Sequence, residues 1–120
     1  MNIDRITALF SAAVLITLLL ASCKKEQGHN TQASPANKAL AMKGEPLFMQ
    51  YCANCHPDGE NVSDPLNNLR KSTLKAKHID NPEDIIAIMR KPASRMITFD
   101  VSTLSDQDAR AIAEYILETF

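Results

Sequence analysis

The run CANCH at positions 52–56 constrains this chain more than any other feature of its sequence. It lies in a segment of 78 residues, 43–120, that holds five aromatic side chains and no tryptophan. Chains of this length rarely bury enough apolar surface to fold without a disulfide, a metal or another covalent aid. Two cysteines so close in sequence cannot close a long loop. We therefore expect them to hold a bulky group that completes the core.

The C-x-x-C-H pattern is the attachment signature of c-type haem. In such sites two thiols add across the vinyl groups of the porphyrin, and the adjacent imidazole reaches the iron from one face. The sequence thus predicts that Cys52 and Cys55 bind one haem c covalently and that His56 ligates its iron. The haem would then form most of the core of this small domain.

Two other uses of the cysteine pair fit the sequence less well. A thiol–disulfide redox pair normally opens a helix after a strand in an α/β domain, and no segment here alternates well enough to be a strand. A structural zinc site needs further cysteine or histidine ligands at suitable spacing. The domain offers only His56 and His78 besides the two cysteines.

Composition and periodicity favour an all-α domain. Aromatic residues make up 5% of the chain and glycine only 3 of its 120 residues, which disfavours a sandwich or barrel of short strands. Helical spacing and end signals predict four helices. The first begins near Gly44, with Pro46 at the first helical position, and runs into the CANCH segment. The second covers 72–77, the third is capped by Asn81 and ended by Pro92, and the fourth covers 105–119.

The N-terminal part of the chain indicates export and a lipid anchor. Residues 6–20 form an apolar run that is short for a bilayer span but has the length of a signal-peptide apolar region. The following Leu-Ala-Ser-Cys, 20–23, resembles a bacterial lipoprotein cleavage box; an ordinary secretory signal or a short membrane anchor is the alternative. We expect a signal peptide at 1–22, lipidation of Cys23, a flexible polar tether at 23–42 and the haem domain at 43–120.

Beyond the haem motif, the segment from Gly44 to Tyr115 resembles class I cytochrome c. In that family a glycine and an aromatic on the first helix pack against an aromatic on the last, and Gly44, Phe48 and Tyr115 stand in those places. The family also places a methionine on a loop before the last helix, where this chain has Met96-Ile97-Thr98-Phe99. The resemblance implies a small cytochrome c-like fold around the haem, with Met96 as the sixth iron ligand. It further implies that the Pro65 carbonyl accepts the ring N–H of His56.

Two other side chains compete with Met96 for the iron. Met89 lies among isoleucines at helical spacing, which is more typical of a core position. His78 would give bis-histidine ligation and a lower redox potential. An iron with no sixth ligand would instead bind small molecules, as in a haem sensor or enzyme.

A haem with ligands on both faces has no open coordination position, so one-electron transfer rather than catalysis is the expected function. The expected partners are redox proteins on the periplasmic side of a bacterial membrane. The chain would serve either as a lone carrier or as the cytochrome subunit of a larger membrane oxidoreductase. With 13 Lys and Arg against 14 Asp and Glu, it has no overall basic field for nucleic acid. Basic residues do cluster within 70–95, and we expect this stretch to attract an acidic redox partner.

Overall fold

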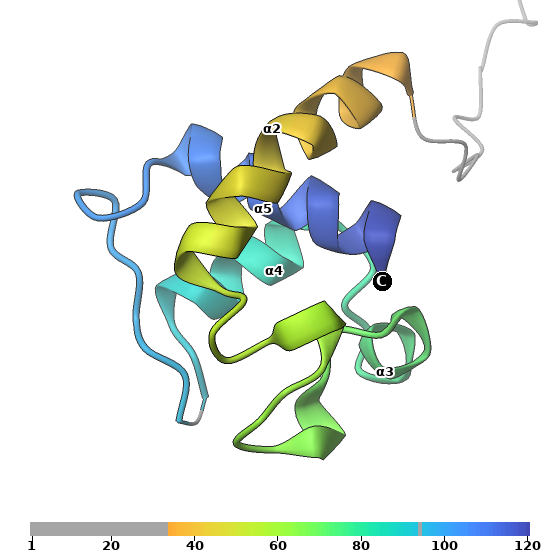
Figure 1. Ribbon diagram of the computed structural model, residues 1–120, viewed down its shortest axis with the longest axis vertical. Helices are drawn as coiled ribbons and strands as arrows, with labels where there is room; N and C mark the ends of the chain where they lie inside the picture. Colours follow the sequence, from red (N-terminus) through yellow and green to blue (C-terminus); the bar gives the residue numbers. More distant parts are fainter. Residues whose placement is uncertain (1–33, 94) are drawn as a thin grey trace, which may run out of the picture. The chain divides into compact units, whose positions relative to one another are not determined.

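The computed structural model describes residues 34–93 and 95–120. This part of the chain contains four α-helices and two short 3-10 turns, joined by loops (Figure 1). No strand occurs within these ranges, which confirms the all-α prediction. The expected signal peptide, Cys23 and residues 24–33 of the expected tether lie outside them. None of the described helices has both the length and the apolar character needed to cross a bilayer. The elements are α2 (Pro35–Tyr51), η1 (Pro57–Gly59), η2 (Pro65–Asn67), α3 (Lys71–Ala76), α4 (Pro82–Arg90) and α5 (Asp106–Thr119).

The first of these helices starts earlier than the sequence predicts. It begins at Pro35, not near Gly44, so residues 35–42 are helical where a flexible tether was expected, and Ala41 is buried. Proline at the first helical position and the strong helix formers that follow favour this start. Pro46 consequently lies inside the helix. It is tolerated there because this side of α2 is exposed, so water can replace the hydrogen bond that proline removes.

The other three helices lie close to their predicted positions. In α4, the Asn81 side chain accepts a hydrogen bond from the Asp84 backbone N–H, and the Asp84 carboxylate accepts one from the Asn81 N–H, which forms a complete capping box. In α5, the Ser105 hydroxyl accepts a hydrogen bond from the Asp108 N–H at 3.1 Å. These side chains satisfy N–H groups that the first turn of a helix leaves unpaired.

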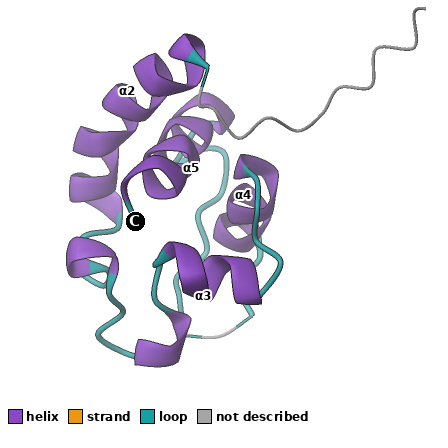
Figure 2. Cartoon of the chain, turned by 90° about the vertical axis from the view of Figure 1, so that its right-hand side faces the viewer, coloured by secondary structure: helices purple, strands orange, loops and turns teal. Residues whose placement is uncertain are grey.

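The core forms where α5 packs between α2 and α4 (Figure 2). Gly44 and Phe48 face α5, and the rings of Phe48 and Tyr115 lie 5.3 Å apart between centroids. This pair and the Gly44 contact join the two helices, and Ile112 of α5 is fully buried in the same core. The contact between the first and last helices expected from the family resemblance is therefore confirmed.

The last residue, Phe120, joins the loop after the CANCH segment to this core. Its ring lies 5.3 Å from that of Phe48 and 5.8 Å from that of Tyr115. Its backbone carbonyl accepts a hydrogen bond from the Lys71 N–H at 3.0 Å, and the ring packs directly on Gly59. The loop of residues 57–70 is thus fixed at both ends.

Candidate functional site

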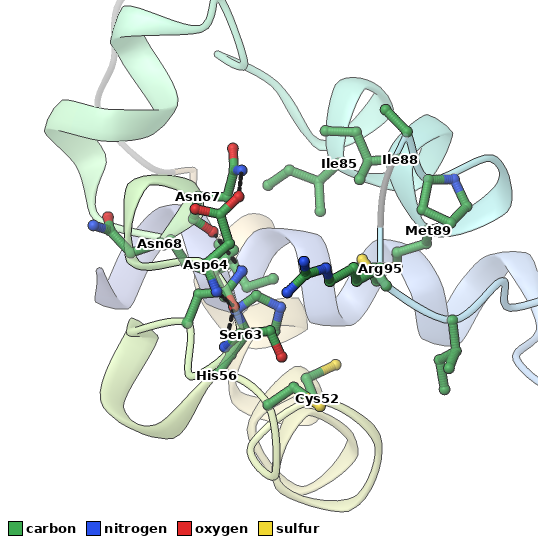
Figure 3. Close-up of a pocket in the computed structure, with 18 of the residues that line it drawn as sticks. Cys52, His56, Ser63, Asp64, Asn67, Asn68, Ile85, Ile88, Met89 and Arg95 are labelled. Carbon is green, nitrogen blue, oxygen red and sulfur yellow. Dashed lines mark hydrogen bonds between the residues drawn. The ribbon is translucent and has the colours of Figure 1, made fainter.

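A cavity of about 600 Å³ opens between the end of α2, the loop of residues 61–69, helix α4 and the segment before Phe99 (Figure 3). This volume lies within the range of small-molecule and cofactor sites. The cavity is lined by the four site residues predicted for the haem, Cys52, Cys55, His56 and Met96. Its apolar wall comes from Leu69, Leu74, Ile79, Ile85, Phe99 and Ile116.

The cysteine pair follows directly from the end of α2. The Cys52 N–H still donates to the Phe48 carbonyl at 2.8 Å, and the N–H groups of Cys55 and His56 both donate to the Cys52 carbonyl, at 3.0 and 2.9 Å. This tight turn brings both thiols and the imidazole to the same cavity. The two cysteines do not form a disulfide with each other. Burial, with a smaller contribution from neighbouring Cys55, raises the pKa of the Cys52 thiol to about 11.

The His56 ring is held in one orientation by the backbone. Its Nδ1 lies 2.9 Å from the Glu60 carbonyl oxygen. Because a carbonyl can only accept, Nδ1 carries the proton and the lone pair on Nε2 is free for a metal. Burial lowers the pKa of His56, and the hydrogen bond to the Glu60 carbonyl partly opposes this effect. Both the location and the tautomer of the imidazole suit iron ligation.

The partner of His56 differs from the one that the family resemblance implies. The Pro65 carbonyl accepts a hydrogen bond from the Asn68 side chain at 2.9 Å, not from His56. The difference arises in the turn at 57–59, where Asp58 has a φ of 51° and Gly59 a φ of 79°. These left-handed conformations fold the chain back so that the next carbonyl, that of Glu60, faces the imidazole.

The three candidates for the sixth ligand differ in their surroundings. His78 is exposed and is not among the residues that line the cavity, whereas both methionines are. Met89, labelled in Figure 3, lies on α4, is only 3% exposed and belongs to the hydrophobic core. Met96 is half-buried on a loop with no helical hydrogen bonds to fix its backbone. Of these side chains, Met96 combines access to the cavity with freedom to approach a metal.

The mouth of the cavity is polar, and sequence reasoning missed how its loop is built. The Asn61 side chain accepts hydrogen bonds from the N–H groups of Ser63 and Asp64, at 3.0 and 2.9 Å, and donates to the Asn67 carbonyl at 3.0 Å. Asparagine and aspartate before proline are turn signals, which could have predicted this loop. Three exposed basic residues, Lys77, Lys91 and Arg95, complete the mouth.

The chemistry of the site suits a covalently bound haem. Two cysteines outside any disulfide, an imidazole with an available Nε2 and a thioether line one cavity with an apolar wall. Residues 39–116 match the profile of a family described as cytochrome C oxidase, cbb3-type, subunit III. The cytochrome c6-like protein of Nostoc sp. (strain PCC 7120) is 36% identical over 89 residues, which are 74% of this chain and 79% of that protein. The chain belongs to the family of monohaem c-type cytochromes.

Solved structures of other c-type cytochromes share its fold. OmcF, the outer membrane cytochrome F from Geobacter sulfurreducens, is 34% identical with a TM-score of 0.62, and the match covers 64% of this chain and 98% of that one. Cytochrome c6B from Synechococcus sp. WH8102 is 36% identical with a TM-score of 0.58, covering 63% and 85%. As a c-type cytochrome, the chain binds one covalent haem c. Residues 52–56 fit the attachment motif of this haem. It is a one-electron carrier and not an enzyme.

Proposed function

We propose that Cys52 and Cys55 hold the haem of this electron carrier through thioether bonds, and that His56 and Met96 ligate its iron. The observation that carries the proposal is that one cavity is lined by all four side chains. The bound haem supplies a one-electron couple between ferric and ferrous iron. The chain supplies the orientation of the ligands and a largely apolar wall.

The proximal side is prepared by the backbone. The Glu60 carbonyl fixes the His56 ring through Nδ1 and leaves Nε2 free. An imidazole held in this way needs little movement when the iron changes charge. The hydrogen bond also raises the basicity of the ring, which strengthens its bond to the metal.

On the distal side, the surroundings of the candidates favour Met96. His78 would have to leave its exposed position after the C-cap of α3, and Met89 would have to leave the core. A thioether ligand favours ferrous iron, so this pair of ligands gives a higher potential than two histidines would.

The oxidised protein tests this ligation through the weak charge-transfer band between a thioether and ferric iron. We expect Met96→Ala to abolish the band and Met89→Leu to retain it. The volume-conserving change at Met89 keeps the core filled. His78→Asn should also leave the band unchanged. If the band survives in Met96→Ala, Met96 is not the ligand; if the wild-type protein lacks the band and binds carbon monoxide without displacing a ligand, the open haem of a sensor is the better account.

We further propose that the carrier is anchored on the periplasmic side of a bacterial membrane through a lipid on Cys23. The support is the apolar run at 6–20 followed by the cleavage-box sequence at 20–23. More than one acyl chain gives stable anchoring where a single chain does not. Mass spectrometry of the membrane-extracted protein should show a chain that begins at an acylated Cys23. An unmodified mature N-terminus, or an intact apolar run at 6–20 in the membrane-extracted protein, would contradict the anchor.

A second role is favoured by the description of the matching family, which names an oxidase subunit. In that case the chain would pass electrons within a larger membrane oxidoreductase. Gentle detergent extraction followed by size analysis separates the two roles. A lone polypeptide indicates a carrier, and co-purification with other haem subunits indicates a complex.

A further inference from the structure

The segment that carries Met96 is secured mainly at its two ends. It connects α4 to α5 over residues 91–105. Among the described residues from Pro92 to Thr98, none forms a hydrogen bond with another described residue. From Asp100 onward the chain is ordered by a turn, in which the Leu104 N–H donates to the Asp100 carbonyl at 3.0 Å and the Leu104 side chain is buried. The position of Met96 therefore depends on how firmly Phe99, three residues later, is held.

The backbone N–H and the backbone carbonyl of Phe99 both form hydrogen bonds with residues at the end of α4. Its N–H donates to the Met89 carbonyl at 3.0 Å. Its carbonyl accepts a hydrogen bond from Nη1 of Arg90 at 2.8 Å. The Phe99 ring is 4% exposed, so it is fixed in the core as well. Two consecutive residues of α4 thus define where the Met96 segment ends.

Arg90 makes a second contact with the same guanidinium. Nη2 donates to the Asp106 carboxylate at 2.7 Å, at the first residue of α5. The planar guanidinium directs these two bonds in fixed directions, which lysine cannot reproduce. One side chain therefore joins the end of α4, the far side of the Met96 segment and the start of α5.

We propose that Arg90 is a positioning residue that keeps Met96 at the haem iron. The inference rests on the ligation by Met96 proposed above. Without the guanidinium, the Phe99 carbonyl loses its charge-assisted partner and the segment gains conformational freedom. States in which the thioether has left the iron then become more populated, and the carrier acquires a site for external ligands.

The hydrogen bond from Arg90 to the Phe99 carbonyl should matter more for Met96 than the ion pair with Asp106. Asp106 is 77% exposed at its side chain, and exposed ion pairs contribute little to stability. The Arg90 side chain is only 20% exposed, which shields its bond to the Phe99 carbonyl from water. Asp106→Asn should accordingly have a smaller effect than loss of the guanidinium.

The chain offers a matched control. Arg110 on α5 donates to Glu83 on α4 at 2.7 Å, so it joins the same two helices as Arg90. This pair is more exposed, with 44% and 63% of the two side chains accessible. It makes no contact with the Met96 segment among the bonds of the described residues. Arg110→Gln thus removes an ion pair between α4 and α5 while leaving the loop anchored.

The experiment titrates the ferric holoprotein with imidazole, which competes for the coordination position of the thioether, and follows loss of the thioether charge-transfer band. All variants are compared well below their unfolding temperatures. We expect Arg90→Gln to lower the apparent Kd for imidazole roughly tenfold or more. Hydrogen bonds from a charged donor are strong enough for their loss to shift the equilibrium toward the detached thioether by this factor. Arg90→Lys should fall between this value and wild type, whereas Arg110→Gln should match wild type.

Equal imidazole affinity in Arg90→Gln, Arg90→Lys and Arg110→Gln would overturn the proposal and leave Arg90 with a structural role only. If Arg90→Gln does not fold, the lysine variant alone decides: an affinity equal to that of wild type contradicts the proposal. Failure of the ligation itself looks different, since the wild-type band would then be absent or insensitive to Met96→Ala.

Discussion

Gly44 on α2 lies directly against the backbone of Ala111 on α5. A Cβ atom added at Gly44 would lie 2.0 Å from the Ala111 carbonyl oxygen and 2.9 Å from Cβ of Tyr115. Both neighbours belong to a helix that is itself fixed in the core, so neither can move away easily. Glycine is required here because two helix backbones approach each other, not because of an unusual φ angle.

We expect Gly44→Ala to lower the free energy of unfolding by about 3 kcal/mol or more, since the added methyl group forces the two helices apart. The measurement is denaturant unfolding of the holoprotein, followed by the haem absorbance and by helical circular dichroism. The exposed neighbour provides the control, because Lys43→Ala should change stability by no more than about 0.5 kcal/mol. Equal stability of the two variants would show that α2 and α5 cross at a greater distance.

A second close approach joins Gly59 to Phe120. Gly59 has a φ of 79°, and a Cβ added there would lie 2.6 Å from Cδ1 of the Phe120 ring. We expect Gly59→Ala to cost about 3 kcal/mol, of which about 1 kcal/mol is the left-handed conformation and the rest is the clash. Phe120→Ala should cost about 2 to 3 kcal/mol because its ring is only partly buried.

A double-mutant cycle separates the two contributions to the cost at Gly59. In the Phe120→Ala background, Gly59→Ala should cost only about 1 kcal/mol, because the ring that causes the clash is gone. Strictly additive costs would mean that the two residues do not touch. Gly59 also precedes Glu60, whose carbonyl holds the His56 imidazole. Gly59→Ala should therefore disturb this hydrogen bond as well.

Much of this structure could be predicted from local signals in the sequence. The CANCH run specified the cofactor, and the caps at Asn81 and Ser105 placed the starts of α4 and α5 within one residue. Such signals act through neighbours in the chain, so they can be read without knowing the fold. The Gly44 contact needed more, and it was predicted through resemblance to a family rather than from the residues alone.

The errors concern features that depend on context. Pro46 indicates a helix start when read locally, but Pro35 supplies an earlier one and the exposed side of α2 tolerates the second proline. The partner of His56 could not be predicted, because it depends on the left-handed turn at Asp58 and Gly59. The contacts of Arg90 could not be predicted from the basic stretch that contains it, since its two partners lie 9 and 16 residues away in sequence.

The turn after Phe99 predicts a dependence of stability on pH. The Asp100 carboxylate accepts hydrogen bonds from the Ser102 hydroxyl at 2.7 Å and the Thr103 N–H at 2.8 Å. These bonds, that of Ser102 first, lower the pKa of Asp100 from 3.8 to about 2. Because the folded pKa lies below the unfolded one, the charged group stabilises the fold above about pH 4, and this stabilisation is lost as the pH falls through about 2.

Asp100→Ala should therefore be less stable than wild type at neutral pH, by an amount that stays constant down to about pH 5 and shrinks between about pH 4 and pH 2. Denaturant unfolding at a series of pH values measures the difference between the two proteins. Ser102→Ala provides an independent check, since loss of its hydroxyl should raise the pKa of Asp100 in an NMR titration. A difference that does not change with pH would mean that the carboxylate makes no such bonds.

The basic cavity mouth predicts that electron exchange depends on salt. Two of the arginines in the basic stretch pair with acids, Arg70 with Glu60 and Arg90 with Asp106, so their charges are largely offset. Lys77, Lys91 and Arg95 are exposed at the cavity mouth, where Asp64 is the acidic residue in the lining. An anionic oxidant should therefore be attracted to this surface, and ions in the buffer should screen the attraction.

Two small oxidants of opposite charge test this surface without knowledge of the natural partner. Raising the ionic strength from about 0.01 M to 0.5 M, where the Debye length falls from about 30 Å to only a few ångströms, should slow oxidation of the ferrous protein by ferricyanide and speed oxidation by a cationic cobalt(III) phenanthroline complex. Lys91→Gln should lower the low-salt ferricyanide rate roughly twofold or more, and Lys43→Gln on α2 should leave it nearly unchanged. Rates that do not respond to salt with either oxidant would show that these charges form only a solvated surface.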